Sequence, residues 1–300
     1  MMNQHTLKKE YTFEGKGLHT GRYSHICIKP APANSGISFL RTDLGVTVPA
    51  QAKYVSSTQR STALTFDGAT VMTVEHILST LTGLGVDNAL IETDAEEMPI
   101  LDGSTALYVE AILNDGLEEQ EAERVYLEIS EAMEVEDVKS GSWLRITPAD
   151  APSVDIEIDF GSKVLGVQKV HWDETVSYAD QIAPCRTFCF FHELEFLVSQ
   201  GLVQGGDVDN AIVVVENPVS DEQLERVSRI FDKKDIKASD SGYLNNLELH
   251  FQDECGRHKM LDILGDLRLA GGFLKAHIEA YKPGHGINTL AAKAAQSKLK

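Results

Sequence analysis

Three polar side chains recur at helical spacing in the segment CGRHKMLDILGD. His258 and Asp262 are four residues apart, and Asp266 follows after another four. On an α-helix such residues share one face, so they would form a polar stripe on an otherwise apolar helix. Buried polar groups need partners. A bound metal ion would supply them, and so would a surface location with His258 and Asp262 as an ion pair. This helix alone leaves both interpretations open.

A second polar pair, Glu75 and His76, opens the segment TVEHILSTLTGLG. An adjacent Glu and His are weak support by themselves, because most such pairs lie at solvated helix positions. With His258 and Asp262, however, His76 would complete a metal site of two histidines and one aspartate, with a position open for water. Glu75 beside that site could act as a general base. The combination favours a metal site.

Two further histidines lie among glycines. His285, in KPGHGIN, is predicted to lie in a tight exposed loop, either without a role or closely approached by a ligand. His19 lies in GKGLHTG, whose spacing is not that of a dinucleotide-binding loop and which is followed by strand-like alternation. We predict a glycine-rich hairpin there. His19 at its tip could contact a phosphate.

An apolar run, CRTFCFFHELEFLVSQGL, covers residues 185–202. It is interpreted either as a buried core helix or as an apolar channel for a long acyl chain. Cys185 and Cys189 within it are four residues apart, which could hold a metal on a helix. Without a second Cys/His pair of matching spacing, ordinary reduced thiols are the preferred interpretation.

The elements that must position these residues follow one order twice, strands first and then helices. This order predicts two α+β halves and suggests a duplication, although no residue-level repeat is evident. In the first half, strands are expected at 11–14, 24–29, 37–41, 61–66 and 88–92, and helices from a Thr73 cap to Gly83 and Gly85 and at 104–114. In the second half, strands are expected at 125–129, 142–147 and 154–160, and helices at 179–185, 191–200, 220–231 and 254–272.

The charged run EEQEAER, residues 118–124, separates the two halves. We interpret it as a domain linker, with a solvated helix end as the alternative. The expected domains are therefore 1–123, carrying Glu75 and His76, and 124–300, carrying His258, Asp262 and His285. A chain of 300 residues with 42% hydrophobic content is long enough for two cores.

Composition excludes several classes of partner. The formal net charge of −19 argues against general affinity for nucleic acid or for anionic membranes. The N-terminal residues lack an apolar signal core, and no segment approaches the ~20 apolar residues of a membrane span. We expect a cytoplasmic protein without stable membrane insertion.

Taken together, seven segments resemble one family, the zinc-dependent UDP-3-O-acyl-N-acetylglucosamine deacetylases of lipid A biosynthesis. They are GKGLHTG, TVEHILSTLTGLGVDNALIE, EMPILDGS, CRTF, LVQGGDVDNAIVV, RHKMLDILGDL and YKPGHGIN. They occur in the family's order and cover nearly the whole chain. The resemblance implies removal of an N-acetyl group from a UDP-linked acylated N-acetylglucosamine. It also implies two similar layered α+β domains, each with an insert, and an active site between them.

The resemblance also implies roles for individual residues. His76, His258 and Asp262 would bind Zn²⁺. Glu75 would be the general base, and His285 the general acid, oriented by Asp266. Lys259 and Thr187 would stabilise the developing negative charge. Leu18 and His19 would contact the substrate, with His19 near the diphosphate, and Phe160 would stack on uracil. Phe188 and Phe191 would line an acyl passage in the second insert, at about 188–215.

One segment departs from the family's pattern. Residues 57–65 read STQRSTALT, where family members often carry a cysteine near Ser61, so the entrance to the site is expected to differ. Some members are fused to a hydroxyacyl-carrier-protein dehydratase, and the sequence is compatible with either a single-function enzyme or a piece of a longer protein. The alternative function is a protein that binds zinc and a nucleotide-sugar lipid without turnover. A structural zinc is disfavoured, because only three ligands are evident and closed sites usually have four.

Overall fold

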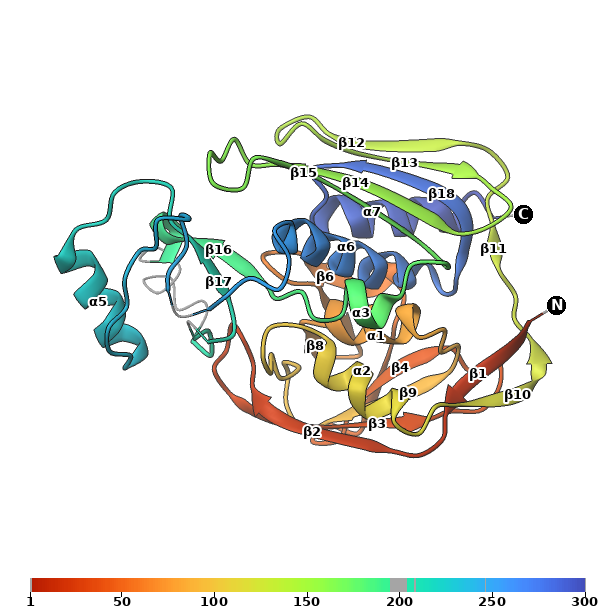
Figure 1. Ribbon diagram of the computed structural model, residues 1–300. Helices are drawn as coiled ribbons and strands as arrows, with labels where there is room; N and C mark the ends of the chain where they lie inside the picture. The colour runs from red at the N-terminus through yellow and green to blue at the C-terminus, as the bar shows by residue number, and fades with distance from the viewer. Residues whose placement is uncertain (1, 195–203, 208, 246, 300) are drawn as a thin grey trace.

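The computed structural model describes residues 2–194, 204–207, 209–245 and 247–299. Two sheets form the outer layers of the molecule, and most of the helices lie between them (Figure 1). Each half of the chain contributes one of these sheets and its own helices. The predicted α+β architecture of two layered halves is therefore confirmed.

The sheet of the first half has the order β2–β3–β9–β4–β5, in which only β4 and β9 run parallel. Its strands are β2 (Tyr11–Lys16), β3 (Tyr23–Pro30), β4 (Ile37–Arg41), β5 (Val46–Pro49) and β9 (Ala89–Thr93). Helix α1 (Glu75–Gly83) precedes β9 along the chain, and α2 (Ala106–Leu113) follows it. The hairpin of β2 and β3 encloses the glycine-rich turn, as predicted.

The sheet of the second half repeats this topology. Its order is β12–β13–β18–β14–β15. Among these five strands, β14 and β18 are the pair that runs parallel. Its strands are β12 (Met133–Asp137), β13 (Ser142–Pro148), β14 (Ser153–Asp159), β15 (Val167–Asp173) and β18 (Leu274–Tyr281), with β11 (Leu127–Glu128) added along β18. Helix α6 (Glu254–Leu267) precedes the last strand and α7 (His285–Gln296) follows it. The suspected duplication is thus visible in the strand order.

Side-chain alternation directs one face of each sheet toward the helices. In β18, Leu274, Ala276, Ile278 and Ala280 are buried while the residues between them are partly exposed. A strand with this period of two covers a core with one face and meets solvent with the other. Helices α1 and α6 lie between the buried faces of the two sheets, and most of their residues are buried.

Helices α1 and α6 come into backbone contact at Gly265. A Cβ atom added at Gly265 would lie 2.1 Å from the carbonyl oxygen of Glu75, so only glycine allows this approach. The contact places the beginning of α1 against the last turn of α6. It therefore brings the first half's polar pair to the second half's polar stripe.

The beginning of α1 differs from the prediction. Val74 is the N-cap residue, and the Thr73 side chain does not cap the helix. Thr73 has a φ of 57°, and its hydroxyl donates instead to Glu97 Oε1 at 2.9 Å. The predicted end is confirmed, since α1 ends at Gly83 and Gly85 has a positive φ.

The charged run predicted to be a linker is a strand. β10 (Leu117–Glu123) pairs antiparallel with β1 (Asn3–Leu7) from the other end of the half. Its glutamates are tolerated because this two-stranded ribbon is largely exposed. The domain boundary between residues 123 and 124 stays a prediction.

Each half carries an insert. The first contains η1 (Ala52–Tyr54) and the sheet of β6 (Val55–Ser57), β7 (Ala63–Phe66) and β8 (Ala69–Met72). The second contains the parallel pair β16 (Phe188–Phe190) and β17 (Ile212–Val214) together with α5 (Asp221–Phe231), and it projects from the side of the molecule (Figure 1). Its separate core extends to Leu244, beyond the expected limit at residue 215. Most of the helix expected at 191–200 lies outside the described residues.

Three other predicted elements are shorter than expected. The helix expected at 179–185 is the short α3 (Tyr178–Gln181), and the strand expected at 125–129 is only β11. The helix expected at 254–272 stops at Leu267 and continues as η2 (Arg268–Ala270), which ends at Gly271 with a φ of 105°. None of the helices within the described part of the chain is long and apolar enough to cross a membrane.

Candidate active site

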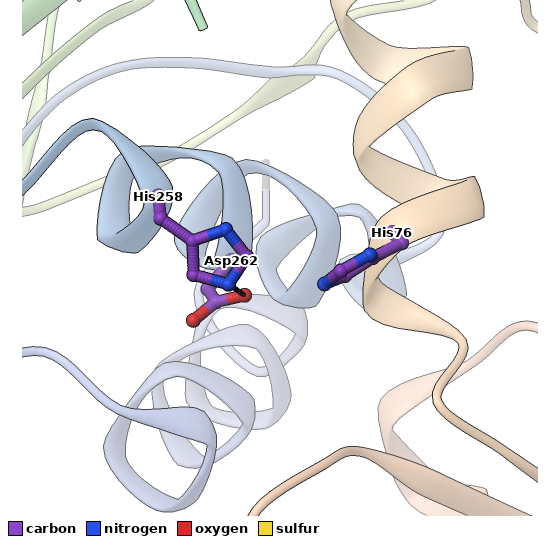
Figure 2. A group of neighbouring side chains, drawn as sticks. All are labelled: His76, His258 and Asp262. Atoms are coloured by element: carbon purple, nitrogen blue, oxygen red, sulfur yellow. Dashed lines mark ion pairs between the residues drawn. The ribbon is translucent and has the colours of Figure 1, made fainter. Parts of the chain in front are cut away.

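The predicted metal ligands converge from both halves. His76 lies in the first turn of α1, and His258 and Asp262 lie on consecutive turns of α6 (Figure 2). One ligand atom from each of the three residues lies within 4.8 Å of the other two, and all three side chains are buried. His258 Nε2 and Asp262 Oδ1 are 3.5 Å apart. The residues fit a site for one cation.

Hydrogen bonding and charge prepare these side chains as ligands. His258 Nδ1–H donates to the Cys185 carbonyl at 3.1 Å, which leaves the Nε2 lone pair on the side of Asp262. Burial lowers the pKa of His258, and burial together with the neighbouring His258 lowers that of His76 to about 3. Both imidazoles are therefore neutral at pH 7.

Asp262 supplies the negative charge of this group. Burial by itself would raise the pKa of Asp262, but Lys259 and the surrounding histidines outweigh it and lower the pKa well below its usual range. Lys259 Nζ donates to Asp262 Oδ2 at 2.8 Å. Two neutral imidazoles and one carboxylate are a donor set that zinc prefers in catalytic sites.

Glu75 and His285 face each other beside the three ligands. Glu75 Oε1 lies 3.9 Å from His285 Nε2, and Glu75 Oε2 accepts a hydrogen bond from the Thr62 backbone N–H at 2.9 Å. Burial raises the pKa of Glu75 above its usual range; the neighbouring His285 opposes this effect, and Asp266 and Asp262 add to it. The carboxylate is thus a stronger base than an exposed glutamate.

His285 is not the exposed loop residue that its flanking glycines suggest. It is the first residue of α7, and its side chain is only 10% exposed. Its Nδ1 lies 3.0 Å from Asp266 Oδ2. Burial opposes protonation of His285, but the negative charges of Asp266, Asp262 and Glu75 prevail and raise its pKa.

The sequence is similar to known proteins over nearly its whole length. The profile of the UDP-3-O-acyl N-acetylglycosamine deacetylase family (LpxC) matches residues 4–231 and 232–296. The chain belongs to this family. It is 42% identical to the UDP-3-O-acyl-N-acetylglucosamine deacetylase of Saccharophagus degradans, a match that covers 96% of this chain and 88% of the relative. The corresponding protein of Pasteurella multocida is 38% identical, over 98% of this chain and 90% of the relative.

Other relatives are longer. The chain is 42% identical to the "Bifunctional enzyme LpxC/FabZ" of Porphyromonas gingivalis, with 100% of this chain and 65% of that protein covered. Two further bifunctional relatives, from Bacteroides thetaiotaomicron and Chlorobaculum tepidum, are covered over 66% and 63% of their length. The chain therefore spans about two thirds of the bifunctional members of the LpxC family that it matches.

An aromatic wall borders the ligand group of this LpxC family member. The ring centroids of Phe188 and His258 are 6.4 Å apart, and Lys259 Nζ lies 5.4 Å from the centre of the Phe188 ring. Phe160, exposed just beyond the end of β14, packs edge-on against Phe188 at 5.6 Å. Of the predicted substrate-binding residues, Phe160 and Phe188 therefore lie near the site.

Leu18, His19, Thr187 and Phe188 line one small cavity of about 70 Å³. His19 is 5% exposed, and neither ring nitrogen has a hydrogen-bond partner among the described residues. The backbone of Thr187 is fixed because its N–H donates to the Gly103 carbonyl at 2.8 Å. Phe191 is not among the residues that line this cavity; it is buried in the core of the second insert.

Sequence reasoning missed the residues that hold Asp266. Thr62 Oγ1 donates to Asp266 Oδ1 at 2.6 Å, and Asn288 Nδ2 donates to Asp266 Oδ2 at 3.0 Å. Asn288 follows His285 by three residues in GHGIN, so helical spacing could have indicated it. Thr62 comes from the first insert, and no local pattern points to it.

Glu97 was also missed. Its side chain is buried and accepts hydrogen bonds from the backbone N–H groups of His19 at 2.9 Å and Thr20 at 2.8 Å, and from the hydroxyls of Thr20 and Thr73. One carboxylate thus ties the glycine-rich turn to the residues that precede α1. Its place at the start of EMPILDGS was the available signal.

Proposed function

We propose that the chain is a zinc-dependent hydrolase that deacetylates UDP-3-O-(3-hydroxyacyl)-N-acetylglucosamine. The reaction gives acetate and the free amine, a committed step of lipid A biosynthesis. The observation that carries the proposal is the 3.9 Å separation of Glu75 and His285 directly beside a buried group of three metal-binding side chains. Membership of the LpxC family supports the choice of substrate.

His76, His258 and Asp262 would hold the zinc ion. When bound, zinc would polarise the acetyl carbonyl and lower the pKa of the attacking water. The position of Glu75 suits it to remove a proton from that water as the new C–O bond forms. Its raised pKa makes it a better proton acceptor than an ordinary glutamate.

His285 is proposed to protonate the leaving nitrogen. The C–N bond cannot break to give an amide anion, so the nitrogen needs a proton from an acid. Asp266 keeps the His285 imidazole protonated and holds its Nδ1, which leaves Nε2 to donate. The attacking water supplies the oxygen of acetate, and the amine leaves with the proton from His285.

Charge on the acetyl oxygen is proposed to be opposed by Lys259 and Thr187. Lys259 lies against Asp262 and Phe188, at the edge of the ligand group. Donors placed where charge develops act most strongly in a site from which water is excluded. Leu18, His19, Phe160, Phe188 and Phe191 stay the predicted substrate contacts.

The proposal is tested by metal content and acetate release together. The purified protein should contain about one zinc per chain and release acetate from the UDP-linked substrate. Glu75→Ala should retain zinc and lose turnover, whereas His258→Ala should lose zinc. Binding of zinc and substrate without acetate release by the wild-type protein would instead establish the alternative, a binding protein without turnover.

Two wider expectations belong to this proposal. A cytoplasmic location is tested by cell fractionation. A hydroxyacyl-carrier-protein dehydratase domain in the full-length protein is supported by the three longer relatives. Reading the gene beyond the codon for Lys300 tests it.

A further inference from the structure

A second cavity, of about 400 Å³, lies between the two halves and shares no residue with the candidate active site. It is bordered by the end of α1 from the first half and by the end of α6 from the second. Thr82 lines this cavity near the end of α1, whereas Glu75 begins the helix. The rise of an α-helix separates these two residues by roughly 10 Å, so the cavity and the candidate active site are distinct. The cavity volume is within the range of small-molecule sites, roughly 300–1,000 Å³.

Most of the cavity wall is apolar. Leu84 and Leu117 line it from the first half, and Val154, Leu264 and Ile278 line it from the second. Trp172 is another wall residue, and its buried Nε1–H has no hydrogen-bond acceptor among the described residues. An aliphatic group would fill such a space favourably, and a polar group would have to meet specific donors.

Arg268 supplies such donors. It lines the cavity, is 6% exposed, and donates from Nη2 to the carbonyl oxygens of Val86 at 2.9 Å and Asp87 at 3.2 Å. Its Nη1 has no acceptor in the described part of the chain. Burial lowers the pKa of Arg268 to about 10, against the opposing effect of Asp87.

The nearby carboxylate is already engaged by a second arginine. Arg124 donates to both oxygens of Asp87, at 2.9 and 2.8 Å. Both guanidinium groups lie against Phe273, with their carbon atoms 3.9 Å (Arg268) and 4.2 Å (Arg124) from its ring centre. The Asp87 carboxylate is thus bonded to Arg124, whereas the hydrogen bonds of Arg268 go to backbone carbonyl oxygens, and a buried charge without a full partner is unfavourable.

We propose that this cavity binds an amphipathic carboxylate with an unbranched aliphatic chain. The carboxylate pairs with Arg268, whose Nη1 lacks an acceptor among the residues that the structure describes, and the chain lies along the apolar wall. Glu174, an acidic residue of the lining, is exposed and accepts from the Tyr126 hydroxyl, so it does not compete for Arg268. Such a ligand would complete the charge balance at Arg268 and contact both halves at once.

The test is calorimetric titration of the metal-loaded protein with decanoate below its micellar concentration. One decanoate site should be independent of the candidate active site, and decanol, which has the same chain without the charge, should bind to that site at least tenfold more weakly. Arg268→Gln should weaken decanoate binding by at least tenfold, because a charge-assisted hydrogen bond is lost. It should leave decanol binding nearly unchanged.

A second variant keeps the test valid if Arg268→Gln unfolds. Val176, a partly buried lining residue, can be replaced by Trp to fill the cavity from its edge, and Val176→Trp should abolish the decanoate site in this cavity. Phe188→Ala, beside the candidate active site, is the matched control and should leave it intact. Absence of binding to the wild type, or binding lost in Phe188→Ala but retained in Val176→Trp, would overturn the proposal.

Discussion

Asp266 Oδ2 and His285 Nδ1 lie 3.0 Å apart, although the two residues belong to different helices, α6 and α7. The pairing leaves His285 Nε2 directed toward Glu75. A buried imidazole alone would lose its proton at neutral pH, whereas this one has a raised pKa because carboxylates surround it. The relationship therefore determines the protonation state of the proposed acid.

Asp266→Asn should move the alkaline limb of the pH profile of kcat/KM to lower pH. The general acid works only when protonated, so activity falls as pH rises through the pKa of His285. Removal of the neighbouring negative charge lowers that pKa, by roughly one unit or more. An alkaline limb that stays in place in Asp266→Asn would show that His285 is not the titrating acid. Asn288→Ala removes a hydrogen bond to Asp266 but no charge, so it should cause a smaller shift.

Glu75→Gln should reduce kcat by roughly 10²- to 10⁴-fold, the usual contribution of a general base. Metal content should be unchanged, because Glu75 is not one of the three proposed ligands. In the wild type, activity should fall as pH drops through the pKa of Glu75, and burial places that limb above the usual carboxyl range. Retention of the acid limb in Glu75→Gln, measured with a sensitive acetate assay, would assign it to another group.

Chelation of the metal should abolish acetate release and lower the melting temperature. A ligand that binds only the folded state stabilises it, so its removal shifts unfolding to lower temperature. Added zinc should restore both properties in the wild type. His258→Ala should melt at the same temperature with and without chelator, and a chelator effect in that variant would place the metal elsewhere.

Gly265→Ala should destabilise the fold by about 1–3 kcal/mol, because the added methyl group forces α1 and α6 apart. It should also lower kcat, since Glu75 and His76 begin the displaced helix. Gly284→Ala is the matched control, because a Cβ atom there meets nothing within 4 Å. Denaturant unfolding measures both variants, and equal stabilities would mean that the helix contact can relax.

Locally encoded features could be predicted from the sequence. His258 and Asp262 share a helix face because of their spacing alone, and α6 is buried along most of its length. The strand order of the two sheets could not be predicted from local patterns. The repeated order of strands and helices indicated a duplication, but no residue-level repeat was evident to support it.

Where a feature depends on partners that are distant in the sequence, its prediction was wrong or missing. β10 looked like a charged linker because its partner, β1, lies at the opposite end of the half. His285 looked exposed because glycines flank it, but Gly284 is an extended N-cap and α7 begins at His285. The hydrogen bond from Thr62 to Asp266 joins residues 204 positions apart, which no local pattern encodes.

The proposed ligands come from both halves, and this has a mechanical consequence. His76 belongs to α1 of the first half and His258 and Asp262 to α6 of the second, and the two helices meet at Gly265 without intervening side chains. Movement of one helix relative to the other would therefore change the geometry of the ligand set around a bound ion. A bound zinc ion would act as a cross-link between the two halves, and the exchange rate of isotopically labelled zinc would report how often that cross-link opens.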